Sequence, residues 1–292
     1  LFEILKDQKK DVKIAGNIGI PILSLKKITQ KTIFVIEASS YQLDYSKLFN
    51  SKYAAILNIS PDHLERHKTL KNYISAKFNI IKNQKKNSIA FINKHDEHIK
   101  KKIKKDNYKS RLIKVNTRIS NKLLKVFKNN YFLSSSNREN LSFVLEISKK
   151  LKIKKNILIS VIKKFKGLKY RQQIILNTKN ISIINDSKST SYSSSLEMLK
   201  SLNNIYWLLG GIPKKGDSLK LPKRYNKNIK GFIFGKNNKK FSLELKNKIE
   251  FKKFLNLKEA LNRLLKDIKK DNSVKKTILF SPSAASFDSF KN

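Results

Sequence analysis

Short apolar runs alternate with segments of helical periodicity along almost the whole chain. Eight apolar runs read as strands, at residues 12–19, 32–39, 53–60, 88–93, 181–188, 205–211, 231–235 and 277–284. Helical spacing of apolar residues occurs within residues 70–83, 140–151, 195–202 and 257–268. Strands that alternate with helices indicate parallel α/β sheets, and continuous apolarity is typical of strands covered on both faces. The sequence therefore predicts an α/β fold with mostly parallel sheets.

A polar segment interrupts this alternation. KFKGLKYRQQ, residues 164–173, contains one glycine among basic and amide side chains, and a new series of strands and helices begins after it. Domain boundaries fall in polar segments of this kind. We predict two α/β domains, residues 1–167 and residues 168–292.

Polar residues or glycines follow most of the predicted strands. Ligands of parallel α/β sheets bind beyond the carboxyl ends of the strands. The residues at these ends are Asn17, Glu37, Asp62 with His63, Asp186 with Lys188, Gly210 with Gly211, and Ser283 to Ser286. Because six strand ends share this chemistry, we expect an active site between the two domains.

The formal net charge of +44 is typical of nucleic-acid-binding proteins. However, 58 of the 65 basic residues are lysines, and they are spread along the whole chain. Arginine is the usual reader of base edges. Many asparagines and isoleucines accompany the lysines, and all three residues have A/T-rich codons, so compositional drift explains the charge. We therefore expect no specific nucleic-acid partner.

The composition also indicates the cellular compartment of the protein. The chain has no cysteine, which excludes disulfides and thiol catalysis and fits a reducing environment. It contains no apolar run long enough to cross a bilayer, and no cationic segment followed by an apolar one that would direct secretion. These features predict a cytoplasmic protein without a membrane partner.

The sequence EASSYQL, residues 37–43, places a carboxylate beside hydroxyl groups at a strand end. Mg²⁺ prefers one or two carboxylates together with water and substrate phosphates, so Glu37 is a candidate metal ligand. Alternatively, Ser39 or Ser40 caps the following helix and Glu37 has no special role. The residues by themselves leave both interpretations open.

The sequence NISPDHLERHKTL, residues 58–70, is the richest polar segment. Asp62 could cap a helix, where its charge would meet the positive end of the helix dipole. His63 and His67 are four residues apart, but their order differs from the HExxH pattern of zinc hydrolases and no third ligand is evident. We expect His63 to face the active site near Glu37, and His67 to lie on the surface or in a salt bridge.

Two segments follow strands of the second predicted domain. NDSKSTSYSSSLEML, residues 185–199, ends a strand and opens a helix, and helix N-termini bind anions. Lys188 and Thr190 could hold a carboxylate or phosphate there, although simple Ser/Thr capping would also explain the hydroxyl groups. The glycine pair of LLGGIPKKGD, residues 208–217, would allow the backbone to approach a substrate. No GK[ST] phosphate loop occurs in the chain.

Taken in order, these motifs resemble those of the Mur ligase family over essentially the whole chain. The resemblance is carried by GNIGIP, IEASSYQL, NISPDHLERH, YISAKFNI, SNRENLSFVLEI, FKGLKYRQQ, INDSKSTS, LLGGIPKKGD and LFSPSAASFDSFKN. NDSKST and SPSAASFD resemble the members that add D-glutamate, whereas the central motifs are shared more loosely with other Mur ligases and with folylpolyglutamate synthases. The resemblance implies a mostly parallel central ATPase domain followed by a Rossmann-like C-terminal α/β domain.

The resemblance implies an ATP-dependent ligase that forms an amide bond. ATP would phosphorylate the terminal carboxylate of UDP-N-acetylmuramoyl-L-alanine, and the amine of D-glutamate would then displace phosphate from the acyl phosphate. This reaction belongs to the cytoplasmic synthesis of peptidoglycan precursors. Charge that develops on phosphoryl oxygens needs Mg²⁺ and cations rather than a covalent nucleophile. The expected oligomeric state is a monomer.

The resemblance also implies roles for individual positions. By composition Lys77 is only one of 58 lysines, but it matches a lysine that is carbamylated in the family. The implied metal ligands are Glu37, His63 and carbamylated Lys77, and the implied catalytic residues are Lys77, His63 and Lys188. The implied substrate-binding residues are Asn17, Ser39, Lys188, Thr190, Lys214 and Ser286. The implied nucleotide-binding residues are Asn137, Asn140, Arg171 and Asp186.

The chain departs from the family pattern in three places. The phosphate-binding loop and the uridine-nucleotide domain of the family would precede Leu1, and a further aromatic residue would follow the C-terminal FKN. We therefore expect a fragment truncated at both ends, which would be inactive by itself. Ser136 stands where the family usually has histidine. The alternatives are a ligase that adds another amino acid, or glutamate to folate, a gene remnant, and a basic non-catalytic nucleic-acid-binding protein.

Overall fold

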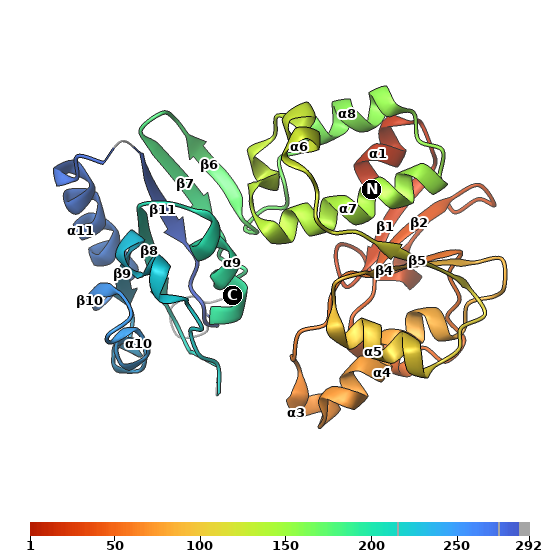
Figure 1. Cartoon of the computed structure of the whole chain (residues 1–292), viewed down its shortest axis with the longest axis horizontal. Coiled ribbons are helices and arrows are strands. Elements are labelled where there is room, and N and C mark those ends of the chain that lie inside the picture. Colours follow the sequence, from red (N-terminus) through yellow and green to blue (C-terminus); the bar gives the residue numbers. More distant parts are fainter. Residues whose placement is uncertain (215, 274, 286–292) are drawn as a thin grey trace. The chain divides into compact units, whose positions relative to one another are not determined.

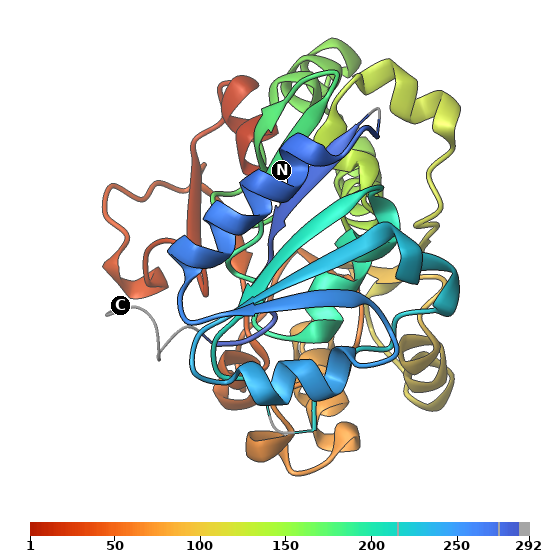
Figure 2. The same cartoon turned by 90° about the vertical axis from the view of Figure 1, so that its left-hand side faces the viewer.

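The computed structural model describes residues 1–214, 216–273 and 275–285, except for the side chain of Leu133 (Figures 1 and 2). The chain divides into two compact units. The first unit comprises Leu1–Phe132 and Asn137–Lys164, and the second comprises Leu133–Ser136 and Phe165–Asn292. Each unit has its own sheets and its own hydrophobic core.

The first unit contains two parallel sheets. Strand β1 (Val12–Gly16) pairs with β2 (Ile33–Glu37), and β4 (Ile89–Asn93) lies between β3 (Tyr53–Ile56) and β5 (Arg111–Val115). The helices are α1 (Phe2–Asp7), α2 (Ser40–Tyr45), α3 (Leu64–His67), α4 (Leu70–Lys82), α5 (Glu97–Lys105), α6 (Asn121–Phe127), α7 (Ser135–Lys150) and α8 (Lys155–Lys164), with 3₁₀ turns η1 (Ile22–Ser24) and η2 (Asn130–Leu133). The first residues of α7 group with the second unit.

The central strand β4 shows why the apolar runs are continuous. Ala90 and Ile92 point into a cluster with Phe78 and Ile81 of α4. Phe91, between them in sequence, packs on the opposite face against Phe143 of α7. All three β4 residues are fully buried. A strand covered on both faces needs apolar side chains at every position, as the run at 88–93 indicates.

The second unit is built on one six-stranded sheet with the order β10-β9-β8-β11-β7-β6. All neighbouring strands are parallel except β6, which runs antiparallel to β7. The elements are β6 (Gln173–Asn177), β7 (Ile181–Asn185), α9 (Tyr192–Ser201), β8 (Ile205–Gly210), η3 (Lys223–Asn228), β9 (Ile229–Phe234), α10 (Asn238–Leu245), β10 (Glu250–Phe254), α11 (Leu257–Lys270) and β11 (Lys276–Phe280).

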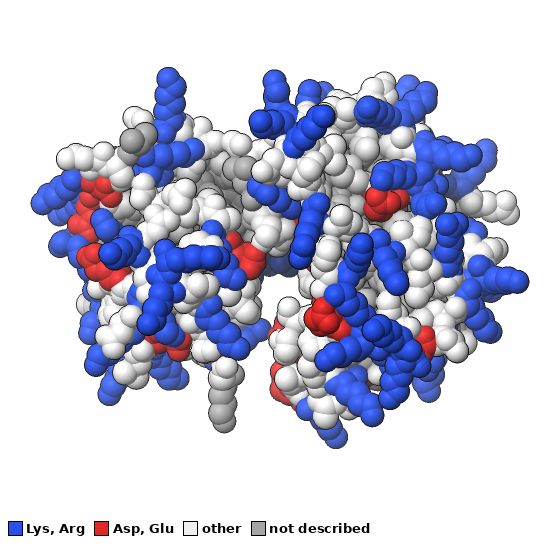
Figure 3. Space-filling view, viewed as in Figure 1, with Lys and Arg blue, Asp and Glu red and all other residues white. Residues whose placement is uncertain are grey.

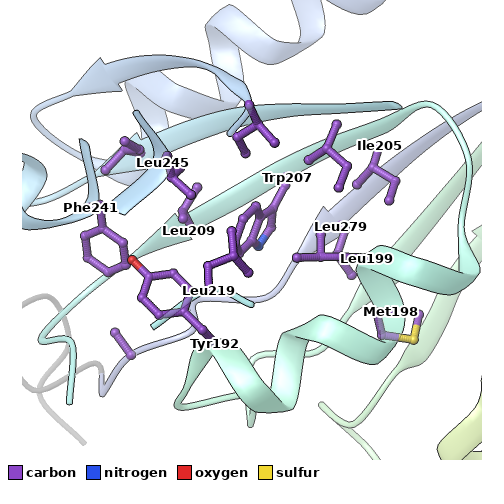
Figure 4. Close-up of a cluster of buried hydrophobic side chains, with 14 of the residues drawn as sticks. Tyr192, Met198, Leu199, Ile205, Trp207, Leu209, Leu219, Phe241, Leu245 and Leu279 are labelled. Atoms are coloured by element: carbon purple, nitrogen blue, oxygen red, sulfur yellow. The ribbon is translucent and has the colours of Figure 1, made fainter. Parts of the chain in front are cut away.

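Helices cover both faces of this sheet. Helices α9 and α10 pack on one face around Trp207, the single tryptophan of the chain (Figure 4). Helix α11 packs on the other face through Ala260 and Leu264. Trp207 is fully buried, and its indole Nε1 donates a hydrogen bond of 2.8 Å to the carbonyl oxygen of Ser281. This bond joins the end of β11 to the centre of the core.

The predicted fold class is confirmed, and all eight predicted strands form. Three strands were not predicted: β5, β6 and β10. Each lies at the edge of its sheet and has exposed polar or charged residues. Charged residues interrupt β5 and β10, so neither has a continuous apolar run. Strand β6 has a short apolar run, residues 174–176, which directly follows the polar segment 164–173. Within the described part of the chain, no helix has both the length and the apolarity to span a bilayer.

Candidate active site

Glu37 and Asn17 lie side by side at the carboxyl ends of β1 and β2. The strand register pairs Gly16 with Glu37, and the backbone N–H of Asn17 donates to the carbonyl oxygen of Glu37 at 2.7 Å. The Asn17 side chain Nδ2 donates to Glu37 Oε1 at 3.0 Å. A Cβ at position 16 would lie 2.3 Å from the Glu37 carbonyl oxygen, and φ of Gly16 is +106°. Glycine is therefore required for this close approach.

Helix α2 begins at Ser40, three residues after Glu37, and Ser39 is its N-cap. The Gln42 N–H donates to Ser39 Oγ at 3.3 Å, and the Ser39 N–H donates to Gln42 Oε1 at 3.0 Å. This reciprocal pair is a capping box. The predicted Ser39 cap is thus present, but it does not use Glu37, whose side chain is exposed. Both interpretations of EASSYQL are compatible, because the cap and the carboxylate occupy different residues.

His63 and His67 have different environments. The His63 side chain is 40% exposed and lies between two carboxylates, with Nε2 3.6 Å from Asp62 and Nδ1 3.5 Å from Glu65. His67 is only 5% exposed, and its Nε2 lies 3.0 Å from Ser40 Oγ. The expectation that His67 lies on the surface or in a salt bridge is wrong. His67 is buried because it is the last residue of α3, and the end of α3 packs against Ser40 at the N-terminus of α2.

Asp62 does not cap helix α3. The N-cap of this short helix is His63, which has a left-handed backbone conformation with φ of 54° and makes no side-chain capping bond. Asp62 Oδ1 instead accepts a hydrogen bond of 3.0 Å from the His63 backbone N–H. The carboxylate therefore stabilises the turn that presents the imidazole of His63.

Consecutive ring contacts join His63 to Lys77. The Tyr41 ring centroid lies 5.0 Å from that of His63 and 5.6 Å from that of His67. His67 in turn lies 5.5 Å from Tyr73, and the Lys77 ammonium lies 5.3 Å from the Tyr73 ring centroid. Lys77 of α4 and His63 are therefore linked through three aromatic rings, whereas the side-chain hydrogen bond given for Glu37 is to Asn17.

The surroundings of Lys77 change the pKa of its ammonium group. Burial lowers the pKa of its ammonium group below the ordinary value, while the negative charges of Asp62 and Asp96 act in the opposite direction. A lower pKa increases the share of neutral amine at a given pH. Neutral amines react with carbon dioxide, so the environment favours the carbamylation that the family resemblance implies.

The residues of the candidate site would supply only part of the ligands that a magnesium ion needs. Among the described residues, no group of three or more His, Cys, Asp or Glu side chains is arranged to hold a metal ion. Mg²⁺ does not require such a group, since it keeps several waters and shares substrate phosphates. Glu37 offers an exposed carboxylate oriented by Asn17, and His63 offers a half-exposed imidazole. A carbamate on Lys77 would add a further oxygen ligand.

The two asparagines predicted to bind nucleotide differ in exposure. Asn137 is 5% exposed, and its Nδ2 donates to the carbonyl oxygen of Tyr131 at 2.8 Å. Asn140, one turn later on α7, is exposed. Between them, Glu139 accepts a hydrogen bond of 2.8 Å from Asn93, the last residue of β4. Asn93 lies at a strand end, as Asn17 does, but it was not predicted from the sequence as a residue of the site.

Asp186 occupies a buried position after β7 in the second unit. Its Oδ1 accepts from the Gln172 backbone N–H and its Oδ2 from Ser281 Oγ, both at 3.1 Å. Burial raises the pKa of this carboxyl group to about 6, although the two hydrogen bonds and the charge of Arg171 oppose the shift. Asp186 therefore holds the segment before β6 to the end of β11.

The other predicted residues of this unit lie on nearby loops. Lys188 and Thr190, between β7 and α9, have exposed side chains, and the Lys188 N–H donates to the carbonyl oxygen of Tyr170 at 3.0 Å. Arg171 is exposed on the segment before β6, and Lys214 is exposed on the loop after β8. Ser286 lies outside the described residues. Each of the four described side chains lies on a loop near a carboxyl end of a strand or near Asp186.

The family profile of the Mur ligase middle domain matches residues 2–162, which is more than half of the chain. The chain belongs to the Mur ligase family. This confirms the resemblance seen in the sequence motifs, and with it the enzyme class, an ATP-dependent ligase.

Curated relatives of this Mur ligase align along the whole chain. The UDP-N-acetylmuramoylalanine--D-glutamate ligase of Rickettsia prowazekii (strain Madrid E) is 35% identical over 309 residues, covering 100% of this chain and 69% of the relative. The protein of the same name from Wolbachia pipientis wMel is 28% identical over 359 residues, covering 99% of this chain and 70% of the relative.

Solved structures share the fold of this Mur ligase. MurF ligase from Thermotoga maritima in complex with ADP has a TM-score of 0.67 and 14% identity, covering 97% of this chain and 73% of that chain. FolC of E. coli in complex with DHPP and ADP has a TM-score of 0.61 and 10% identity, covering 97% of this chain and 81% of that chain. At these identities the likeness confirms the fold alone, and the individual roles of the site residues stay predictions.

Proposed function

We propose that this Mur ligase joins D-glutamate to UDP-N-acetylmuramoyl-L-alanine at the expense of ATP. The observation that carries the proposal is the alignment, over the entire chain, of relatives named UDP-N-acetylmuramoylalanine--D-glutamate ligase at up to 35% identity. The site residues support it, because a carboxylate, an imidazole and a partly buried lysine lie on segments that follow strands of the first unit. The chain has no cysteine that could act as a nucleophile.

The proposed reaction has two steps. A carboxylate oxygen of the muramoyl-alanine substrate attacks the γ-phosphorus of ATP, and the bond to the bridging oxygen breaks to release ADP. The amine of D-glutamate then attacks the carbonyl carbon, phosphate leaves with the C–O bonding electrons, and the nitrogen loses a proton. A bound Mg²⁺ ion would neutralise the charge that accumulates on the phosphoryl oxygens.

The residues of the first unit would hold this metal ion and the carboxylate substrate. Asn17 orients Glu37 through the 3.0 Å hydrogen bond, and its exposed amide is available for a substrate group in the same place. His63 is held by the turn at Asp62. Lys77 would contribute an oxygen ligand as a carbamate, which replaces its positive charge with a negative one.

The residues of the second unit would bind D-glutamate and nucleotide. D-glutamate carries two carboxylates, and the exposed Lys188 and Lys214 provide cations, with Thr190 as a hydroxyl donor. Arg171 and Asp186 would contact the nucleotide. We also propose that the protein acts as a monomer in the cytoplasm, where ATP and UDP-linked precursors occur.

The test is phosphate release by the full-length protein that contains these residues. The assay contains ATP, Mg²⁺ and UDP-N-acetylmuramoyl-L-alanine, and compares D-glutamate with L-glutamate, L-lysine and D-alanyl-D-alanine. We expect release only with D-glutamate. Release that depends on another amino acid, or on folate with glutamate, would identify a sister ligase, and release with none of them would contradict the proposal.

The nucleic-acid alternative gains no support from the face drawn in Figure 3. On the face drawn in Figure 3, lysines and arginines are scattered over both units, with acidic residues among them. A nucleic-acid site usually gathers its basic residues on one stripe or groove. We therefore expect only weak association with DNA or RNA, which added salt removes.

A further inference from the structure

Four buried serines form a hydroxyl cluster beneath the loops that carry Lys188 and Thr190. Ser189 is 3% exposed, and Ser195, Ser281 and Ser283 are fully buried. They come from three segments: the loop between β7 and α9, the first turn of α9, and the residues after β11. A buried hydroxyl group that lacks a hydrogen-bond partner costs free energy, so the arrangement of this cluster is constrained.

Ser195 is the centre of this serine cluster. Its Oγ lies 2.8 Å from Ser189 Oγ, 2.7 Å from Ser281 Oγ and 2.5 Å from Ser283 Oγ. A hydroxyl group has one proton and two lone pairs. Its Oγ also lies 3.5 Å from the carbonyl oxygen of Ser191, which is farther than any of the three hydroxyl groups. If Ser195 donates to one hydroxyl group and accepts from the other two, its full capacity is used.

One assignment of the protons also satisfies the adjacent carboxylate. Ser281 Oγ donates to Asp186 Oδ2 at 3.1 Å, so Ser281 is left to accept from Ser195. Ser189 and Ser283 then donate to Ser195. In this arrangement the protons point along the chain of hydroxyl groups toward Asp186, and each bond polarises the next.

Backbone bonds connect the same segments. The Ser283 N–H donates to the carbonyl oxygen of Ser189 at 3.0 Å, and the Asp186 N–H donates to that of Phe280 at 2.7 Å. Ser283 has a left-handed conformation with φ of 58°. A non-glycine residue keeps this conformation where surrounding contacts determine it, and here the cluster provides them.

We propose that Ser195 is a positioning residue that fixes the loop 186–191 against the segment 281–285, and thereby sets the affinity for D-glutamate. This inference rests on the proposed function. Ser195 is fully buried and would not touch the ligand. It would act through Ser189, which lies between Lys188 and Thr190, because removal of its one oxygen takes a hydrogen-bond partner from each of three buried hydroxyl groups. Ser189 would keep only Ser194 Oγ, Ser281 only Asp186, and Ser283 only the carbonyl oxygen of Ser281 at 3.4 Å.

The kinetic test compares Ser195→Ala with Ser193→Ala in the full-length protein. Ser193 is exposed on the same helical turn, and its one side-chain hydrogen bond to a described residue is with the Ser191 hydroxyl, at 3.0 Å, so it is the matched control. We expect Ser195→Ala to raise KM for D-glutamate about tenfold while KM for UDP-N-acetylmuramoyl-L-alanine stays unchanged. Ser195→Thr keeps the hydroxyl and should restore most of the affinity.

Three kinetic outcomes would overturn the inference. An unchanged KM for D-glutamate in Ser195→Ala would show that the cluster does not set the affinity. Equal increases in both KM values, or failure of Ser195→Thr to restore the affinity, would show a general loss of structure. A wild-type protein without D-glutamate-dependent phosphate release would contradict the proposed function instead.

Hydrogen exchange tests the positioning role without any substrate. We expect Ser195→Ala to increase amide exchange in both residues 186–191 and residues 281–285, and Ser193→Ala to change neither. Exchange as slow as in the wild type would refute the positioning role, whatever the activity. If Ser195→Ala does not fold, Ser195→Cys replaces it in the test. Cysteine is nearly isosteric with serine but is a weaker hydrogen-bond donor. We expect a smaller increase in amide exchange in the same two segments.

Discussion

His67 Nε2 lies 3.0 Å from Ser40 Oγ in the interior of the first unit. This contact joins the end of α3 to the start of α2, and thereby connects the segments that carry His63 and Glu37. The rings of Tyr41 and Tyr73 enclose the same imidazole. Two histidines of one short segment therefore differ in environment: His67 is buried between α2 and α4, and His63 is exposed enough to take the metal-binding role that we propose.

His67→Ala should destabilise the protein. The change leaves Ser40 without its buried partner and removes the packing between two tyrosines, so the free energy of unfolding should fall by about 2–4 kcal/mol. His63→Ala is the matched control, because His63 is half-exposed, and it should cost less than about 1 kcal/mol. Urea unfolding measures both values. Equal losses in the two variants would contradict the distinction.

Glu37→Gln should abolish phosphoryl transfer without unfolding the protein. Glutamine keeps the side-chain volume and can accept the Asn17 hydrogen bond, but it loses the charge that would bind Mg²⁺. We expect phosphate release to fall on the order of 100-fold or more. Glu97→Gln, an exposed carboxylate on α5, should retain wild-type release. Near-normal activity of Glu37→Gln would remove Glu37 from the metal site.

Lys77 should carry a carbamate in the presence of carbon dioxide. Burial lowers the pKa of its ammonium group, so more of it is neutral and reactive at a given pH than for an exposed lysine. With ¹³C-bicarbonate, carbon NMR should show a carbamate signal that decreases as the pH falls. The signal should be lost in Lys77→Arg and kept in Lys71→Arg, an exposed position on the same helix. A spectrum that Lys77→Arg leaves unchanged would refute the modification.

Asp186 should make stability depend on pH. Burial raises the pKa of this carboxyl group from 3.8 to about 6, so between these values the folded state binds more protons than the unfolded state. The free energy of unfolding should therefore fall as the pH rises through this range, by roughly 3 kcal/mol, and level off above it.

Asp186→Asn should remove most of this slope. Glu250→Gln, at an exposed position on β10, should keep it. Urea unfolding between pH 4 and pH 7, followed by the fluorescence of Trp207 in the core of the second unit, measures the effect. A wild-type stability that rises over this range relative to Asp186→Asn would contradict the assignment.

The sequence by itself determined the features that are encoded over short distances along the chain. Continuous apolar runs identified the strands covered on both faces, such as β4, and the polar residues after them identified the strand ends. The cap at Ser39 depends on Gln42, three residues away, so it could be predicted from the local pattern. Backbone preferences and the periodicity of burial act within a few turns of a helix or one strand.

Only the tertiary structure decided the environment of the polar side chains. His67 is buried because α2 and α3, from separate segments, meet at Ser40. The hydroxyl cluster joins Ser195 to Ser281 and Ser283, which are 86 and 88 residues away. The edge strands β5, β6 and β10 also depend on which strand lies beside them. The burial of a polar group and its hydrogen-bond partners depend on segments that are distant in the chain. The local sequence does not specify which of these segments will pack against each other.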